Sequence, residues 1–208
     1  MVLIRIEPTF AHAKQVLLTG VSAGGFGAAL TADLVGRTFP PGTTFTLIDD
    51  SGPPMSSQYL PTCLQRQWRE LWGFDFTFLA DCGSDCPDHD DYALDWVHFL
   101  TDKYPKAKAG LISATADIVI TAFYGYGNNN CAATALSIMN AADFKAGLMD
   151  FRDDLNGYAN FGTYYIDSST HTWISADNSF YNTTSSGVRL VDWFRGIVDG
   201  TSVANAGP

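Results

Sequence analysis

The chain alternates between short apolar runs and longer segments in which apolar residues recur at helical spacing. The short runs predict strands, because a buried parallel strand is almost continuously apolar and spans only about 4–8 residues. The four predicted strands cover residues 16–20, 43–48, 110–114 and 161–166. The longer segments, several of which end at glycine or proline, predict helices. The four predicted helices cover residues 24–36, 91–104, 132–155 and 187–198.

This order of elements predicts a single α/β domain over residues 1–208, with a mostly parallel sheet flanked by helices. Residues 53–87 interrupt the alternation and are predicted to form an irregular, aromatic-rich, cap-like insertion. The sequence shows no internal repeat and no linker. In open parallel sheets, ligands bind beyond the carboxyl ends of the strands. Residues that directly follow the predicted strands are therefore the first candidates for chemistry.

A serine between glycines follows the first predicted strand. Gly20-Val-Ser-Ala-Gly24 fits the G-x-S-x-G nucleophile elbow, in which the serine occupies a strained turn between a strand and a helix. The flanking glycines leave room for the tight backbone path. The same turn places the backbone N–H of Ala23 at a helix amino terminus, where it can donate to an oxyanion. We predict that Ser22 is a nucleophile; the alternative is a glycine-rich turn that only packs a helix on a strand.

A serine hydroxyl needs a base that accepts its proton at neutral pH. His171 follows the last predicted strand and precedes the final predicted helix, which is where this class of site holds its base. The other histidines fit less well: His12 precedes the elbow, His89 lies in an acidic segment and His98 lies within a predicted helix. We therefore predict that His171 is the general base, against the alternative of an ordinary surface histidine.

The third member of a catalytic triad is an acid from the end of an intervening strand. Asp117 follows the third predicted strand, and the apolar residues after it predict partial burial, as suits a carboxylate that orients an imidazole. Asp49 and Asp50 follow the second predicted strand and compete for this role. We predict that Asp117 is the acid and that Asp49 or Asp50 caps or stiffens the turn before Gly52.

Four segments together carry a family resemblance. They are Gly20-Val-Ser-Ala-Gly-Gly-Phe-Gly27, Ile48-Asp-Asp-Ser-Gly52, Leu111-Ile-Ser-Ala-Thr-Ala-Asp117 and His171-Thr-Trp173. Between about residue 14 and residue 198 the chain resembles the pectin acetylesterase/Notum family of carboxylesterases. The resemblance implies an α/β-hydrolase fold with Ser22, Asp117 and His171 as the triad. It also implies hydrolysis of short acyl esters on sugars or lipidated peptides, usually outside the cell, without a cofactor.

The family carries early strands and a glycine-rich loop before the elbow, and that loop supplies a second oxyanion-hole donor. Only about 15 residues precede the elbow strand here. The resemblance therefore predicts a shortened family member, a fragment, or an enzyme with a rebuilt oxyanion hole. In each case we expect fewer strands, an elbow strand at or near the sheet edge, and Ala23 as the one recognisable donor. Residues 2–6 could form a strand that covers this edge; alternatively, two copies could pair across it as a homodimer or a larger assembly.

The charge of the chain narrows the classes of partner. With 22 acidic and 12 basic residues, the formal net charge is −10. This balance argues against a nucleic acid or an anionic membrane surface, which bind clustered Lys and Arg, and makes a polyanionic substrate unfavourable. No apolar run reaches the roughly 18 residues of a membrane span, and residues 1–7 do not resemble a signal peptide. A small ester or an acylated neutral glycan fits this surface better.

Four cysteines allow three disulfide pairings, and the sequence does not choose among them. Disulfides in the insertion would imply an oxidising compartment. Cys82 and Cys86 could also form half a metal site, but no matching pair of ligands follows at zinc-site spacing, so we expect no metal. The spacing of the aspartates between residues 81 and 91 does not fit a calcium-binding loop, so we expect a solvated acidic run.

These features predict a serine carboxylesterase that cleaves short-chain acyl esters, with glycans as one possible carrier, through an acyl-enzyme. Trp68 and Trp72 in the insertion and Trp173 beside the base are candidate pocket residues, with ordinary core packing as the alternative. Three other functions compete: a general esterase or lipase for small or longer acyl chains, a peptidase, and a catalytically impaired binding module.

Overall fold

The computed structural model describes residues 3–132 and 137–208. Its central feature is a four-stranded parallel sheet with strand order β1-β2-β3-β4. The strands are β1 (Gln15–Val21), β2 (Thr44–Asp50), β3 (Lys108–Ala114) and β4 (Phe161–Ile166). Each overlaps a strand predicted from its apolar run, so the prediction of an α/β fold with a parallel sheet is confirmed.

The remaining regular elements among the described residues are helices and one small β-hairpin. The α-helices are α1 (Leu3–Thr9), α2 (Ala23–Gly36), α3 (Thr62–Trp72), α4 (Phe78–Cys82), α5 (Ala93–Lys103), α6 (Ile118–Gly125), α7 (Ala141–Asp154), α8 (Asp177–Asn182) and α9 (Leu190–Val198). Short 3₁₀ helices cover Phe74–Phe76, Gly83–Asp85 and Leu155–Gly157, and the hairpin joins β5 (Thr184–Ser185) to β6 (Val188–Arg189).

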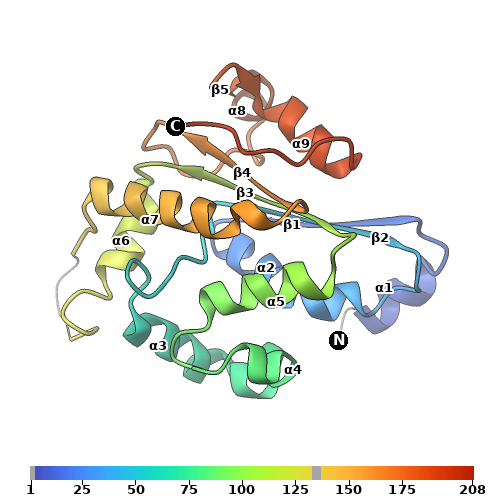
Figure 1. The fold of residues 1–208 in the computed structure, drawn as a ribbon, viewed down its shortest axis with the longest axis horizontal. Helices are drawn as coiled ribbons and strands as arrows, with labels where there is room; N and C mark the ends of the chain where they lie inside the picture. Colours follow the sequence, from blue (N-terminus) through green and yellow to red (C-terminus); the bar gives the residue numbers. More distant parts are fainter. Residues whose placement is uncertain (1–2, 133–136) are drawn as a thin grey trace.

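The helices are divided between the two faces of the sheet (Figure 1). On one face, α2, α5 and α7 pack against the strands, and α3, α4 and α6 extend the same core, which contains buried Trp96 and Phe144. On the other face, α9 packs against β3 and β4 in a smaller core. A Cβ on Gly110 of β3 would collide with Trp193 and Ile197 of α9, so a glycine is needed for this close approach.

The segment 53–87 is more regular than its sequence predicts. It contains α3, α4 and two short 3₁₀ helices, and its aromatic residues enter the main core. The ring of Phe78, for example, lies 4.7 Å from that of Trp96, centroid to centroid. The prediction of an irregular insertion was wrong because the helical pieces are only 3 to 11 residues long. Pieces of this length do not repeat an apolar pattern often enough to reveal a period.

Three predicted boundaries also differ. Residues 3–9 form helix α1, not a strand over the sheet edge; a helix satisfies its own backbone hydrogen bonds and needs no partner strand. Helix α7 begins only at Ala141, where the side chain of Asn140 accepts the N–H of Ala142, and residues 133–136 of the longer predicted helix lie outside the described residues. Helix α9 begins at Leu190 because the β5–β6 hairpin occupies the residues before it.

Strand β1 lies at the edge of the sheet, as the sequence predicts for the elbow strand. In the described part of the chain it pairs with β2 alone. One of its faces is also poorly covered, since Leu17 remains 40% exposed. Pairing of two copies across this edge stays a prediction.

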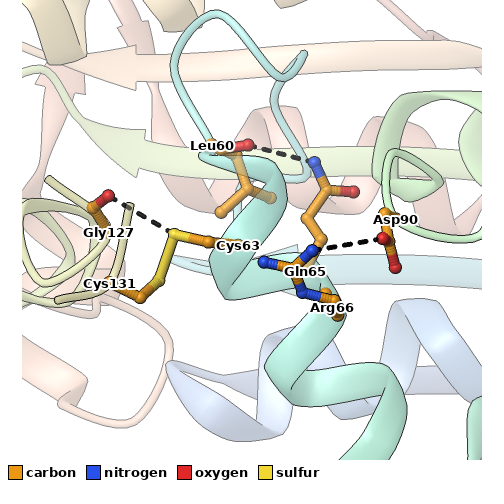
Figure 2. Close-up of a disulfide and its surroundings, with 7 residues drawn as sticks. All are labelled: Leu60, Cys63, Gln65, Arg66, Asp90, Gly127 and Cys131. Atoms are coloured by element: carbon orange, nitrogen blue, oxygen red, sulfur yellow. Dashed lines mark hydrogen bonds and ion pairs between the residues drawn. A yellow bond between two sulfur atoms is a disulfide. The ribbon is translucent and has the colours of Figure 1, made fainter. Parts of the chain in front are cut away.

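Two disulfides select one of the three possible pairings: Cys63–Cys131 and Cys82–Cys86. The first ties α3 to the segment that follows α6 (Figure 2). Gln65, also on α3, accepts the N–H groups of Tyr92 and Ala93 at the start of α5. Helix α3 is therefore anchored on both sides.

None of the described helices combines the length and the apolar character needed to cross a membrane. Across residues 3–132 and 137–208, no group of three or more His, Cys, Asp or Glu side chains is arranged to hold a metal ion.

Candidate active site

The candidate residues lie along the edge of the sheet that the carboxyl ends of its strands form, which is distinct from the lateral edge at β1. The strands are parallel, so their carboxyl ends meet at this edge. One candidate ends or follows each strand, in the order β1 to β4: Ser22, Asp50, Asp117 and His171. The sheet therefore brings together residues that are up to about 150 positions apart in the chain.

Ser22 occupies a turn that few non-glycine residues adopt, with φ 58° and ψ −125°. Its N–H donates to the carbonyl of Asp50 at 2.7 Å, and its own carbonyl accepts the N–H of Gly25 at 2.8 Å as α2 begins. A Cβ on Gly20 would overlap the backbone of Gly24, whereas one on Gly24 would meet no described atom within 4 Å. The crowded glycines are thus Gly20 and Gly25, and the expected crowding at Gly24 is absent.

Two further residues at this edge have left-handed backbone conformations. Ser51 has φ 69° and Thr172 has φ 61°. Such conformations cost roughly 1–3 kcal/mol each and persist where surrounding contacts hold them in place, which happens most often at functional sites. Strain at Ser22, Ser51 and Thr172 marks the ends of β1 and β2 and the loop after β4 as one strongly constrained region.

The buried carboxylate of Asp117 holds the imidazole of His171. Its Oδ2 atom lies 2.7 Å from Nδ1 of His171, whose side chain is 17% exposed. Its other oxygen, Oδ1, accepts the N–H groups of Val119 and Ile120 at 2.9 and 3.0 Å, so Asp117 is also the N-cap of α6. These backbone donors fix the carboxylate, which makes it a rigid acceptor for the imidazole.

The contact with Asp117 determines which nitrogen of His171 can act as a base. A carboxylate accepts a hydrogen bond and cannot donate one, so Nδ1 carries the hydrogen and Nε2 has the free lone pair. Nε2 is buried and has no hydrogen-bond partner among the described residues, so Ser22 is not hydrogen-bonded to it. Such catalytic contacts often form fully only when a substrate is bound.

The two acids at the end of β2 have different surroundings. Asp50 accepts backbone N–H groups from the loop that carries His171. Burial raises the pKa of Asp50, and its hydrogen bonds from Ile174, Trp173 and Ser51 and the charge of His171 lower it. Burial, and next the charge of Asp50, raise the pKa of Asp49 well above its ordinary value of 3.8.

The three candidate pocket tryptophans do not gather at this edge. Trp68 packs in the main core against Phe26, with ring centroids 5.3 Å apart. Trp72 is 60% exposed and lines a groove beside the C-terminal half of α2, near Arg37. Trp173 follows the histidine in sequence, but its side chain is buried in the smaller core on the other face of the sheet.

Helix α6, which adjoins the site, was not predicted from the sequence. Helix α6 begins directly after Asp117 and exposes apolar side chains, with Ile118 61% and Phe123 58% exposed. The signal that could have revealed this helix is the aspartate itself, because Asp before an apolar segment is a common N-cap. Four β-branched residues in succession, residues 118–121, concealed it.

The arrangement combines a hydroxyl on a strained turn, an imidazole with an unpaired nitrogen and a buried carboxylate that orients the imidazole. Ala23, at the amino terminus of α2, adjoins the hydroxyl and is exposed. Such a set can activate a nucleophile and stabilise negative charge that develops beside it. No protein-family model matches the chain and no curated protein matches it.

Proposed function

We propose that this protein is a serine carboxylesterase of the α/β-hydrolase type. The observation that carries the proposal is the 2.7 Å hydrogen bond between His171 and the buried Asp117, at the same sheet edge as the strained turn of Ser22. Nucleophile, acid and histidine follow one another in the chain in the order typical of such hydrolases. The resemblance of four sequence segments to the pectin acetylesterase/Notum family points to the same function.

In the proposed mechanism, Oγ of Ser22 attacks the carbonyl carbon of the ester while Nε2 of His171 accepts the hydroxyl proton. Asp117 keeps the imidazole in the Nδ1–H tautomer and stabilises its positive form. The N–H of Ala23 donates to the oxyanion. The alcohol leaves with the proton from His171, and water then hydrolyses the acyl-serine by the same route. These steps require neither a cofactor nor a metal ion.

The charge of the protein favours a neutral substrate. A net charge of −10 repels polyanions. We therefore propose a short acyl ester, such as an acetyl ester, on a small alcohol or a neutral glycan.

One observation favours a second candidate, a general esterase or lipase that accepts longer acyl chains. Helix α6 exposes the apolar side chains of Ile118 and Phe123, and Ile118 directly follows Asp117. Exposed apolar surface of this kind often binds apolar ligands. Acyl-chain preference therefore separates the two candidates.

The test is a chain-length profile with p-nitrophenyl esters from acetyl to octanoyl, measured on the wild type, Ser22→Ala and Ser186→Ala. Ser186 is a matched control because it is also a serine with positive φ, 48°, but lies in the β5–β6 hairpin. We expect a preference for acetyl to butyryl esters and a loss of roughly 10³-fold or more in kcat/KM in Ser22→Ala alone.

Other outcomes would change the conclusion. A preference for octanoyl esters would favour the lipase-like candidate. Turnover retained in Ser22→Ala would exclude Ser22 as the nucleophile. Failure of a fluorophosphonate to label Ser22 in the folded wild type would favour a binding module without catalysis.

A further inference from the structure

A single residue, Asp50, contacts both the segment that carries Ser22 and the loop that carries His171. It is the last residue of β2 and is fully buried between β1 and β3. Its backbone carbonyl accepts the N–H of Ser22 at 2.7 Å. Its side-chain Oδ2 accepts the N–H groups of Trp173 and Ile174 at 2.6 and 2.8 Å.

Ser51 extends this contact by one residue toward the histidine. Its hydroxyl donates to Oδ1 of Asp50 at 3.0 Å and accepts the N–H of Thr172 at 3.3 Å. The N–H groups of three consecutive residues after His171 are therefore held by Asp50 and Ser51. Hydrogen bonds to an ionised carboxylate are roughly twice as strong as those between neutral groups, so the contact is well suited to hold Thr172 in its left-handed conformation.

We propose that Asp50, assisted by Ser51, is a positioning residue that fixes the loop of His171 relative to the turn of Ser22. The inference rests on the proposed function, and it deepens that function by assigning a role to an acid outside the triad. Asp117 sets the orientation of the imidazole ring, whereas Asp50 sets where the backbone that carries the ring is located. An Asp50 that only stiffened its own turn would need no bonds to residues 173 and 174.

The test compares Asp50→Ala, Asp50→Asn and Ser51→Ala with Asp49→Asn in the full chain. Asp49 is a matched control because it is the neighbouring buried acid, yet neither of its oxygens has a hydrogen-bond partner among the described residues. The first measurement is hydrogen exchange at the amides of Trp173 and Ile174. We expect protection to fall by ~10-fold or more in Asp50→Ala, less in Asp50→Asn, which keeps one acceptor oxygen, and not in Asp49→Asn.

The second measurement is the kinetics of ester hydrolysis. Small displacements of a catalytic group can lower rates by ~10²-fold, so we expect a loss of about this size in kcat for Asp50→Ala with little change in KM. Asp50→Asn should recover part of this loss, and Ser51→Ala should show the smallest loss, with faster exchange at Thr172. If Asp50→Ala does not fold, Asp50→Asn and Ser51→Ala are compared with Asp49→Asn by the same two measurements.

The two measurements separate this inference from the proposed function. If hydrogen exchange at residues 173 and 174 becomes faster in Asp50→Ala and the wild type shows no esterase activity, the anchoring role is supported and the esterase function is rejected. Exchange in the Asp50 variants equal to that in Asp49→Asn would overturn the anchoring role. Faster exchange with an unchanged kcat would overturn it as well, because the loop would then be held without consequence for catalysis.

Discussion

The end of β2 presents two buried acids to two different regions of the molecule. Asp50 faces the loop after β4, where backbone N–H groups and a hydroxyl surround its oxygens. Asp49 faces α2, and among the described residues it has no group with hydrogen-bond geometry to either oxygen. Burial raises both pKa values. The N–H groups of Ile174 and Trp173 and the hydroxyl of Ser51 lower the pKa of Asp50, whereas the only donor that lowers the pKa of Asp49 is the nearby backbone N–H of Gly52, which lacks hydrogen-bond geometry. A buried carboxylate can hold a neighbouring loop in place where backbone N–H groups of that loop donate hydrogen bonds to it. Without such donors, a buried carboxylate destabilises the fold.

Asp117 belongs with the partnered acids, and its substitution should have the largest effect. Asp117→Asn keeps the size of the side chain, but an amide can favour the wrong tautomer of His171, a change that lowers kcat by ~10⁴-fold in serine hydrolases of known mechanism. We expect a loss of this order in esterase kcat, while Asp49→Asn stays within about threefold of the wild type. Equal losses in the two variants would contradict the assignment of Asp117.

A second prediction concerns crowding on the side of α2. A Cβ on Gly25 would overlap Oδ1 of Asp49, whereas one on Gly24 would meet no described atom within 4 Å. We expect Gly25→Ala to lower the free energy of unfolding by about 1–3 kcal/mol, measured by urea denaturation. The matched variant Gly24→Ala should change it by less than about 0.5 kcal/mol. Equal effects would show that the side chain of Asp49 moves away freely.

A third, smaller effect is the dependence of stability on pH. The pKa of Asp49 is raised in the folded protein above the ordinary value of 3.8, so between these two values the folded state binds more protons than the unfolded state. The contribution of Asp49 to stability therefore falls as pH rises above 3.8, by at most about 1.4 kcal/mol per pH unit. Asp49→Asn removes this dependence.

Unfolding of the wild type and Asp49→Asn should be compared at several pH values from about pH 4 upward. The stability difference should shift in favour of the variant as pH increases. A difference that is independent of pH would mean that Asp49 ionises normally in the folded protein.

The local features of the site were readable in the sequence because each depends on few neighbours. The glycine-flanked turn at Ser22 was predicted from five consecutive residues, 20–24. The four strands are revealed by short runs rich in apolar, β-branched and aromatic residues, since the faces of β2, β3 and β4 are largely buried. The alternation of strands and helices then implied that Asp117 and His171 both lie beyond the carboxyl ends of a parallel sheet. That their strands β3 and β4 are neighbours was decided by the structure.

Other features followed from contacts between distant segments. Disulfide pairing required that Cys63 and Cys131, 68 positions apart, meet across α3 and α6. The roles of Asp49 and Asp50 are indistinguishable in sequence, since adjacent strand residues with the same side chain differ only in the face toward which they point. The loop that supplies N–H groups to Asp50 lies more than 120 positions away.

By itself, therefore, the sequence determined the kinds of element, their order and the chemical groups available at the ends of the strands. The tertiary structure decided which acid orients the imidazole, which acid holds the histidine loop and which acid has no hydrogen-bond partner among the described residues. The physical reason is that apolar patterns and turns are local properties of the chain, whereas a carboxylate is stabilised by whichever donors the folded backbone brings to it.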